Sequence, residues 1–259
     1  MNAIRKIKSA EYLKSKKLIL LGFLIYGSVL IVLGATIFLH YHDQNQEYKN
    51  FTIANQTATS MSLVWQSEKP YEGKVYYKEG SSLSQMFSVL SAEVAYDDRN
   101  LELDEAGEYV LLPEADRKMR HTHHVTLRNL KPQTTYSFLL GGNVSGTKFD
   151  VPNSVTLAVE EDLATPDPAY GEVLSLDEDN DTVVILTGRD IPSRVRGRLS
   201  APVSENGSYS FDLSYFQFQE IDGRNLSLRL FSGKDDPKEY TFDTILYKPL
   251  PAIEYSNED

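Results

Sequence analysis

The feature that most constrains this chain is a run of 22 residues without a charge, residues 18–39 (LILLGFLIYGSVLIVLGATIFL). At about 1.5 Å of rise per residue it makes a helix of roughly 33 Å, enough to cross a bilayer core of about 30 Å. Residues 1–17 carry six basic side chains and one acidic, so the positive-inside rule predicts a cytoplasmic N-terminus and an exported remainder. We expect a single-pass protein of the plasma membrane that contacts the lipid bilayer through residues 18–39.

A cleaved secretory signal is the alternative interpretation of this segment. The apolar part of such a signal usually spans about 7–15 residues and leads to a small-residue cleavage site. The run here is longer, and no such site follows it. The sequence therefore favours a retained anchor.

Charge and cysteine content narrow the functions of the exported part. Residues 40–259 hold 20 basic and 36 acidic side chains, a net charge of −16. An acidic domain lacks the basic face that neutralises phosphates, which speaks against nucleic acid as a partner. The chain has no cysteine, which excludes disulfides, thiolate metal sites and cysteine nucleophiles.

The exported part has the pattern of strands between turns, with no helical period. MSLVWQS (61–67) alternates two sets of side chains with a period of two, as in a strand with one buried face. Asn206-Gly207, between two strand-like segments, predicts a hairpin. We expect an all-β ectodomain of two sandwiches. The predicted order is a cytoplasmic basic segment (1–17), a transmembrane helix (18–39), a spacer (40–48), a first sandwich (49–165), a second, smaller sandwich (166–252) and a tail (253–259).

The first sandwich resembles a fibronectin type III module. SLVWQS places Trp65 like the tryptophan of that family's second strand, and LKPQTTY, from Leu130 through Pro132 to Tyr136, resembles its Leu-x-Pro-x-Thr-x-Tyr corner. The resemblance implies that Trp65 and Leu130 lie in the core and that the Tyr136 hydroxyl returns to a nearby backbone group. It departs from the family at residues 81–120, where we expect a long loop or an extra hairpin.

A narrower resemblance covers both sandwiches. AYDDRN (95–100), THHVTLRNLKPQTTYSF, YGEVLS and GSYSFDLSYF resemble membrane-anchored fibronectin type III proteins of candidate-phyla bacteria. In these a carboxypeptidase-regulatory-like or transthyretin-like sandwich comes second, and they offer no established activity. Fibronectin-like modules also precede the catalytic domain of purple acid phosphatases, but no stretch here supplies a metallophosphoesterase domain.

Three histidines fall within HTHHVTL (121–127) and raise the question of a metal site. On a strand His121 and His123 share one face with Val125, and His124 takes the other. His121 and His123 are weak candidates for a two-nitrogen site that still needs another ligand. The pattern favours histidines that are partly buried and hydrogen-bonded at the start of a strand.

Two acidic motifs carry alternatives. In DDR (97–99) neighbouring carboxylates on an extended chain point apart, which is poor geometry for an acid–base pair. We favour a salt-bridge pin in which Arg99 ties the insertion 81–120 to the sandwich, with Asp98 and Arg99 as structural residues; a ligand-binding loop stays open. In DEDND the residues Asp177, Asp179 and Asp181 are spaced like the start of a calcium loop. The glycine and distal glutamate of that loop are missing. An acidic hairpin tip is favoured over a weak calcium site.

No motif of a serine hydrolase, a phosphate-binding loop or a zinc protease occurs. We expect no enzyme and no cofactor, but a surface scaffold or binding component with a protein or glycan partner. An independent adhesin or glycan binder is the alternative, and a metal-dependent hydrolase a minor one. The candidate interface residues, which serve equally well to finish the first core, are Met86, Phe87, Tyr96 and Tyr109.

Overall fold

The computed structural model describes residues 48–80, 92–140, 154–156, 165–176, 181–188, 197–215, 226–242 and 248–255. The chain divides into two compact units, residues 1–45 and residues 46–259, and all described residues belong to the second. Within these ranges no helix has the length and hydropathy of a membrane span. Several predicted features lie outside the described residues, namely the span 18–39 and the residues Met86, Phe87, Asp177 and Asp179.

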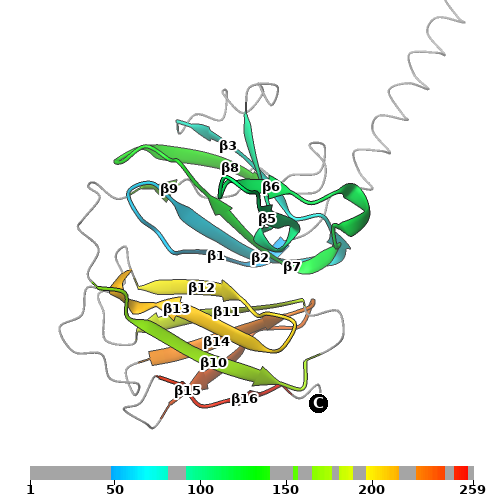
Figure 1. Cartoon of the computed structure of the whole chain (residues 1–259), viewed down its shortest axis with the longest axis vertical. Helices are drawn as coiled ribbons and strands as arrows, with labels where there is room; N and C mark the ends of the chain where they lie inside the picture. The colour runs from blue at the N-terminus through cyan, green and yellow to red at the C-terminus, as the bar shows by residue number, and fades with distance from the viewer. Residues whose placement is uncertain are drawn as a thin grey trace, which may run out of the picture. The chain divides into compact units, whose positions relative to one another are not determined.

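The described strands up to residue 156 form an N-terminal sandwich (Figure 1). One sheet has the order β1-β2-β7, the other has the order β4-β3-β8-β9, and β5 pairs with β6. The strands are β1 (Tyr48–Ala54), β2 (Met61–Tyr71), β3 (Lys74–Glu79), β4 (Glu93–Tyr96), β5 (Leu101–Leu103), β6 (Tyr109–Leu111), β7 (Arg120–Leu127), β8 (Thr135–Leu140) and β9 (Ser154–Val155).

The core of the N-terminal sandwich lies between its two sheets, because alternate residues of each strand point inward. The side chain of Trp65 on β2 is fully buried there, and its Nε1 donates a hydrogen bond to the Tyr71 hydroxyl at 2.6 Å. The remaining members of this core are Met61, Leu63, Val75, Tyr77, Val125, Leu127, Leu130, Tyr136, Phe138 and Leu140.

The predicted corner precedes β8. The hydroxyl of Tyr136 accepts a hydrogen bond from the backbone N–H of Lys131 at 2.9 Å, while Leu130 is buried and Pro132 is exposed in the turn. This is the backbone partner that the sequence motif predicts. The corner ties the loop after β7 to the strand that follows it.

Residues 92–120 add to the sandwich in three ways. The strand β4 pairs antiparallel with β3, and a short 3-10 helix, η2 (Asp98–Asn100), follows it. The hairpin β5–β6 comes next, with Leu103 opposite Tyr109. The described part of the predicted insertion therefore contains an extra hairpin.

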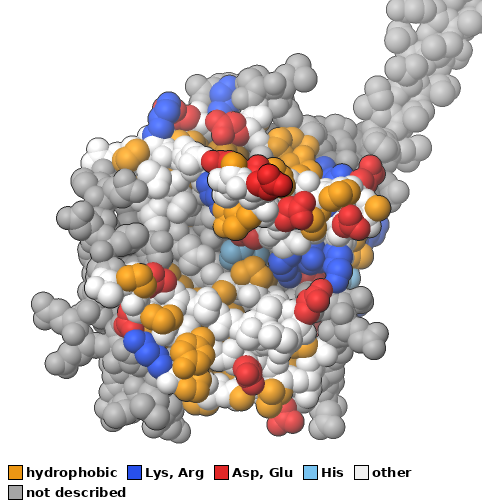
Figure 2. Space-filling model, viewed as in Figure 1, with side chains coloured by type: hydrophobic (Ala, Val, Ile, Leu, Met, Phe, Trp, Pro, Cys, Tyr) orange, Lys and Arg blue, Asp and Glu red, His pale blue; other side chains and the backbone are white. Residues whose placement is uncertain are grey.

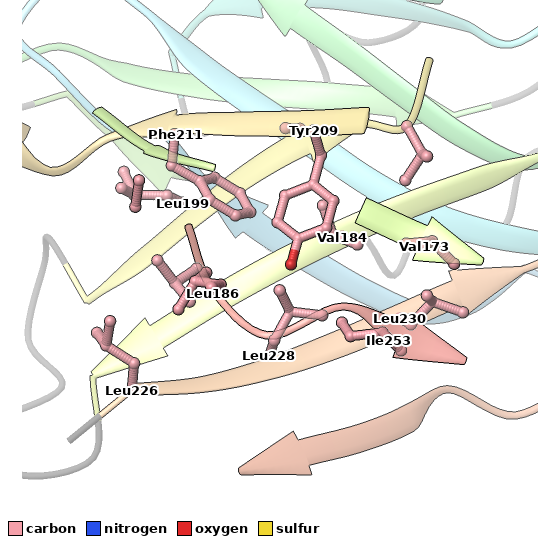
Figure 3. Packing of buried hydrophobic residues seen from close by; sticks show 14 of the residues in the cluster. Val173, Val184, Leu186, Leu199, Tyr209, Phe211, Leu226, Leu228, Leu230 and Ile253 are labelled. Atoms are coloured by element: carbon pink, nitrogen blue, oxygen red, sulfur yellow. The ribbon is translucent and has the colours of Figure 1, made fainter. Parts of the chain in front are cut away.

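The remaining strands form a C-terminal sandwich (Figure 1). Its sheets have the orders β13-β10-β16 and β12-β11-β14-β15. The strands are β10 (Pro168–Leu174), β11 (Thr182–Gly188), β12 (Arg198–Pro202), β13 (Ser208–Asp212), β14 (Leu226–Ser232), β15 (Lys238–Thr241) and β16 (Ile253–Glu254). Figure 3 shows Tyr209 and Phe211 of β13 directed toward Leu186 and Leu228 of the facing sheet. The chain is thus all-β throughout the described residues.

Two expectations for the C-terminal sandwich were wrong. The turn at Asn206-Gly207 is tight, with Gly207 at φ +84, but it joins β12 and β13, which lie in different sheets. A tight turn sets only the local chain reversal, and the buried faces decide the pairing. The predicted tail (253–259) does not begin at residue 253, because Ile253 and Tyr255 are buried and β16 pairs parallel with β10.

Candidate functional site

The outer faces of two sheets, one from each sandwich, meet in a shared contact that we call the junction. Val64 of β2, Val183 and Ile185 of β11 and Phe231 of β14 form an apolar cluster, each at most 1% exposed. Val64 lies between core residues on its strand, so it points away from the N-terminal core. The two sandwiches therefore share buried apolar surface in addition to their own cores.

Hydrogen bonds surround this apolar cluster. Nε2 of Gln66 donates to the carbonyls of Gly233 and Asp235 at 2.8 Å each. At the other side Asn55 and Ser200 exchange bonds, with Nδ2 of Asn55 donating to the Ser200 carbonyl at 2.9 Å and the Ser200 N–H donating to Oδ1 of Asn55 at 3.0 Å. Buried polar groups at the junction thus find partners across it, which makes the contact specific as well as apolar.

Asp181 inserts its carboxylate into the junction. It accepts hydrogen bonds from the backbone N–H of His121 at 2.6 Å and of Thr122 at 3.0 Å, and it lies 3.8 Å from Nη1 of Arg99. Burial raises the pKa of Asp181 above its usual value, although the nearby positive charge of Arg99 acts to lower it. The carboxylate is therefore part of the contact between sandwiches instead of an exposed hairpin tip. In the described ranges, no three His, Asp or Glu side chains are arranged to hold a metal ion.

Asp97 and Arg99 form a buried ion pair beside Asp181. Nε and Nη2 of Arg99 each donate to the Asp97 carboxylate at 2.9 Å, and Nη2 also donates to the carbonyl of Thr122. The backbone N–H of His124 donates to the same carboxylate at 3.0 Å. Burial by itself raises the pKa of Asp97, but the charge and hydrogen bonds of Arg99 outweigh it and hold that pKa well below its usual range.

The imidazole of His123 belongs to the N-terminal core. It stacks on Trp65 at 4.8 Å and packs on Tyr71 at 4.2 Å between ring centroids. Its Nε2 lies 3.1 Å from the Ser67 hydroxyl, and within the described part of the chain its Nδ1 has no hydrogen-bond partner. Burial lowers the pKa of His123 to about 3, so the ring is neutral. The Nδ1 atom of His121 lies 3.0 Å from the carbonyl oxygen of Ser67.

His124 points the other way, into the junction. Its Nδ1 lies 2.7 Å from a carboxylate oxygen of Asp98, and its Nε2 lies 2.9 Å from Oγ of Ser200. This order of groups is that of a serine hydrolase triad. However, Ser200 is 7% exposed and its hydroxyl also accepts from Asn55, so the serine oxygen lies inside the contact between sandwiches.

Asp98 continues the network outward. Its carboxylate accepts hydrogen bonds from the hydroxyl of Thr126 at 2.6 Å and from Nη2 of Arg128 at 2.8 Å, in addition to His124. The guanidinium of Arg128 in turn lies 4.1 Å from the ring centroid of Tyr109. A chain of contacts therefore runs from Ser200 in the C-terminal sandwich to the β5–β6 hairpin.

The sequence prediction for DDR is partly corrected. Arg99 pairs with Asp97 and also reaches the Thr122 carbonyl of β7, while Asp98 pairs with Arg128. The predicted extended segment is the 3-10 helix η2, whose start is capped by Asp97 accepting from the Arg99 N–H. Sequence reasoning missed Asn55 and Ser200, since a lone Asn or Ser near a strand carries no signal of a distant partner.

The β5–β6 hairpin exposes apolar side chains on its surface. Leu103 is 61% exposed, Tyr109 is 53% exposed and Val110 is 37% exposed. Tyr96 on β4 is less exposed than these residues, because its side chain is half-buried. Figure 2 shows acidic and hydrophobic side chains interleaved over this part of the N-terminal sandwich. Of the predicted interface residues within the described ranges, Tyr109 is thus the one that lies open.

The comparisons with known proteins support the fold. A family model of the N-terminal domain of purple acid phosphatase matches residues 48–156. No curated protein matches the chain. The family match and the sheet order identify β-sandwiches of the immunoglobulin and fibronectin type III kind.

Solved structures give weaker likenesses. The sensor domain of the anti-sigma factor RsgI4 of Pseudobacteroides cellulosolvens matches at 21% identity and a TM-score of 0.29, over 46% of this chain and 97% of that one. The FN1–FN3 domains of chicken CNTN1 match at 14% and 0.26, over 82% and 68%. Two fibronectin type III domains of chicken tenascin match at 11% and 0.24, over 76% and 99%. These TM-scores are too low to support an inference about function.

Proposed function

We propose that this chain is a non-catalytic, membrane-anchored scaffold or binding component of a cell-surface assembly. The anchor is the uncharged run 18–39, and the exported part is the acidic pair of sandwiches. The proposal also draws on the resemblance to membrane-anchored fibronectin type III proteins of candidate-phyla bacteria whose second sandwich is carboxypeptidase-regulatory-like or transthyretin-like.

The observation that carries the proposal is the junction. The cluster around Val64 and Phe231 and the bonds from Gln66 and Asn55 hold two sandwiches as one compact unit. A linker between freely moving modules needs no such contact, whereas a scaffold gains a fixed distance and angle between its binding faces. Rigid presentation reduces the entropy lost when a partner docks.

The buried polar groups fit a structural role. The carboxylates of Asp97, Asp98 and Asp181 accept hydrogen bonds from other groups of the protein. His123 is neutral inside the core. A general acid or base needs a substrate atom within about 2.6–3.2 Å. The Ser200–His124–Asp98 row faces the junction, so we assign it to holding the sandwiches together.

Extraction of the full chain from its membrane in mild detergent tests the proposal. A scaffold co-purifies with partners in stoichiometric amounts, identified by mass spectrometry. A monomer that retains a glycan on an array supports the adhesin alternative instead. Turnover of an ester or peptide panel that Ser200→Ala abolishes supports a hydrolase and contradicts our assignment.

A further inference from the structure

We propose that the β5–β6 hairpin is the docking surface for a protein partner that combines basic side chains with an apolar pocket. This inference rests on the proposed function and specifies the chemistry of the partner. The exposed apolar side chains of the hairpin are Leu103 and Tyr109, which lie opposite one another, and Val110 on the other face.

The hairpin is held ready to bind. Its turn is closed by Asp104, whose Oδ1 accepts from the N–H groups of Ala106 at 2.8 Å and Glu108 at 2.9 Å, and by Gly107 at φ +80. At its base the Leu112 N–H donates to the carbonyl of fully buried Asn100 at 3.0 Å. A preorganised apolar anchor loses little conformational entropy on docking.

Tyr109 is fixed through the contacts already described. Arg128 lies over its ring at 4.1 Å, and Arg128 is itself bound to Asp98, which contacts His124. One face of the ring is thereby covered, while Tyr109 as a whole stays 53% exposed. Tyrosines held in this way are frequent anchors of protein interfaces.

Charge selects the kind of partner. The segment 101–111 carries four carboxylates, on Glu102, Asp104, Glu105 and Glu108, and no basic residue. Such a rim attracts basic side chains and repels anionic lipid and nucleic acid. A second copy of residues 40–259, at net −16, is disfavoured for the same reason. The observations therefore favour a basic protein surface.

The C-terminal sandwich contains a matched control. Tyr170 is 46% exposed and Leu174 is 45% exposed on one face of β10, with the exposed Glu172 between them. This surface offers the same side-chain types with a single carboxylate. If apolar exposure alone drove docking, both surfaces would bind equally well.

The first experiment measures binding of a synthetic peptide of alternating Lys and Leu to the full chain in detergent. We expect Leu103→Ser with Tyr109→Ser to weaken binding about tenfold or more, and Tyr170→Ser with Leu174→Ser to change it less than about twofold. Glu105→Gln with Glu108→Gln should weaken binding and flatten its salt dependence. Equal effects of the two surfaces, or stronger binding to vesicles rich in phosphatidylserine, would overturn the proposal.

The second experiment places a photo-crosslinking amino acid at position 109 or position 170 in the producing cells. We expect a discrete protein adduct from position 109 that Glu105→Gln with Glu108→Gln suppresses. Stoichiometric partners in the detergent extract without that adduct would refute the hairpin and leave the scaffold function standing. An adduct that depends on these charges, from a chain that extracts without stoichiometric partners, would support the hairpin and contradict the stable assembly.

Discussion

The guanidinium of Arg99 binds the carboxylate of Asp97 through two hydrogen bonds, from Nε and Nη2, both with a nitrogen–oxygen distance of 2.9 Å. The Asp97 side chain is 1% exposed and that of Arg99 is 12% exposed, so water replaces neither partner. A buried charge that loses its partner is strongly destabilising, even where the intact pair adds little net stability.

Asp97→Asn should therefore lower the free energy of unfolding by about 3–5 kcal/mol, because it keeps the shape but removes the anion that Arg99 contacts with two hydrogen bonds. Urea denaturation followed by circular dichroism measures this loss. Glu79→Gln serves as the control, since it breaks the exposed pair with Lys131 and should leave the midpoint nearly unchanged. Equal midpoints for the two variants would contradict the structural weight we give to the Asp97–Arg99 pair.

His123 makes stability depend on pH. Its pKa is about 3 in the fold, below its ordinary 6.5, so the folded ring stays neutral while the unfolded chain takes up a proton below pH 6.5. The contribution of the neutral ring is thus fully present above pH 6.5 and is lost as the pH falls toward 3, by up to about 1.4 kcal/mol per pH unit.

His123→Phe keeps a ring between Trp65 and Tyr71 and removes the titration. Unfolding free energies measured from pH 7 to pH 4 should fall less steeply for this variant than for the parent. Asp97, whose pKa is held below 3.8, also loses its contribution on acidification, but only below about pH 4, and it does so in both proteins. Parallel curves over the whole range would show that His123 is not the cause.

Val64→Asp should uncouple the two sandwiches. The carboxylate is buried while the junction is closed and reaches water once it opens, so the change acts on the contact more than on the N-terminal core. Calorimetry of the parent should show one cooperative transition, and the variant should show two. Val94→Asp, at a valine that is 39% exposed on β4, is the matched control. A single transition at an unchanged temperature in Val64→Asp would argue against a cooperative junction.

Tyr209→Phe should stabilise the protein by about 1 kcal/mol. The hydroxyl of Tyr209 lies in the C-terminal core and finds no hydrogen-bond partner among the described residues, and burial raises its pKa. Its removal relieves the cost of keeping a polar group dry. Tyr71→Phe is the opposite case, because it leaves Nε1 of Trp65 without its acceptor and should destabilise by about 1 kcal/mol. Thermal melts of both variants test the contrast.

The sequence contains enough to predict the local features of the fold. A period of two predicts the faces of β7, with His123 inward and His124 outward, and the corner motif predicts the hydroxyl bond of Tyr136. These features depend on residues close together in the chain, whose side-chain directions follow from the backbone alone.

The junction is beyond such local reasoning. Nothing near Val64 shows that its face is covered by Phe231, and the contact between His124 and Ser200 joins residues 76 positions apart. The pairing of Asp97 with Arg99 also depended on a 3-10 turn that an extended chain does not have. The packing of one sandwich on the other decides which distant residues meet, and the local sequence pattern does not distinguish among the possible partners.

The neighbouring histidines of β7 have one more consequence. A slip of β7 by one residue against β2 would exchange inner and outer faces, so Val125 would face the junction and Thr126 would face the apolar core. In the direction that brings Val125 to the position of His124, Ser200 and Asp98 would lose their imidazole partner. Docking of the C-terminal sandwich on β7 therefore stabilises the native register of that strand over this alternative.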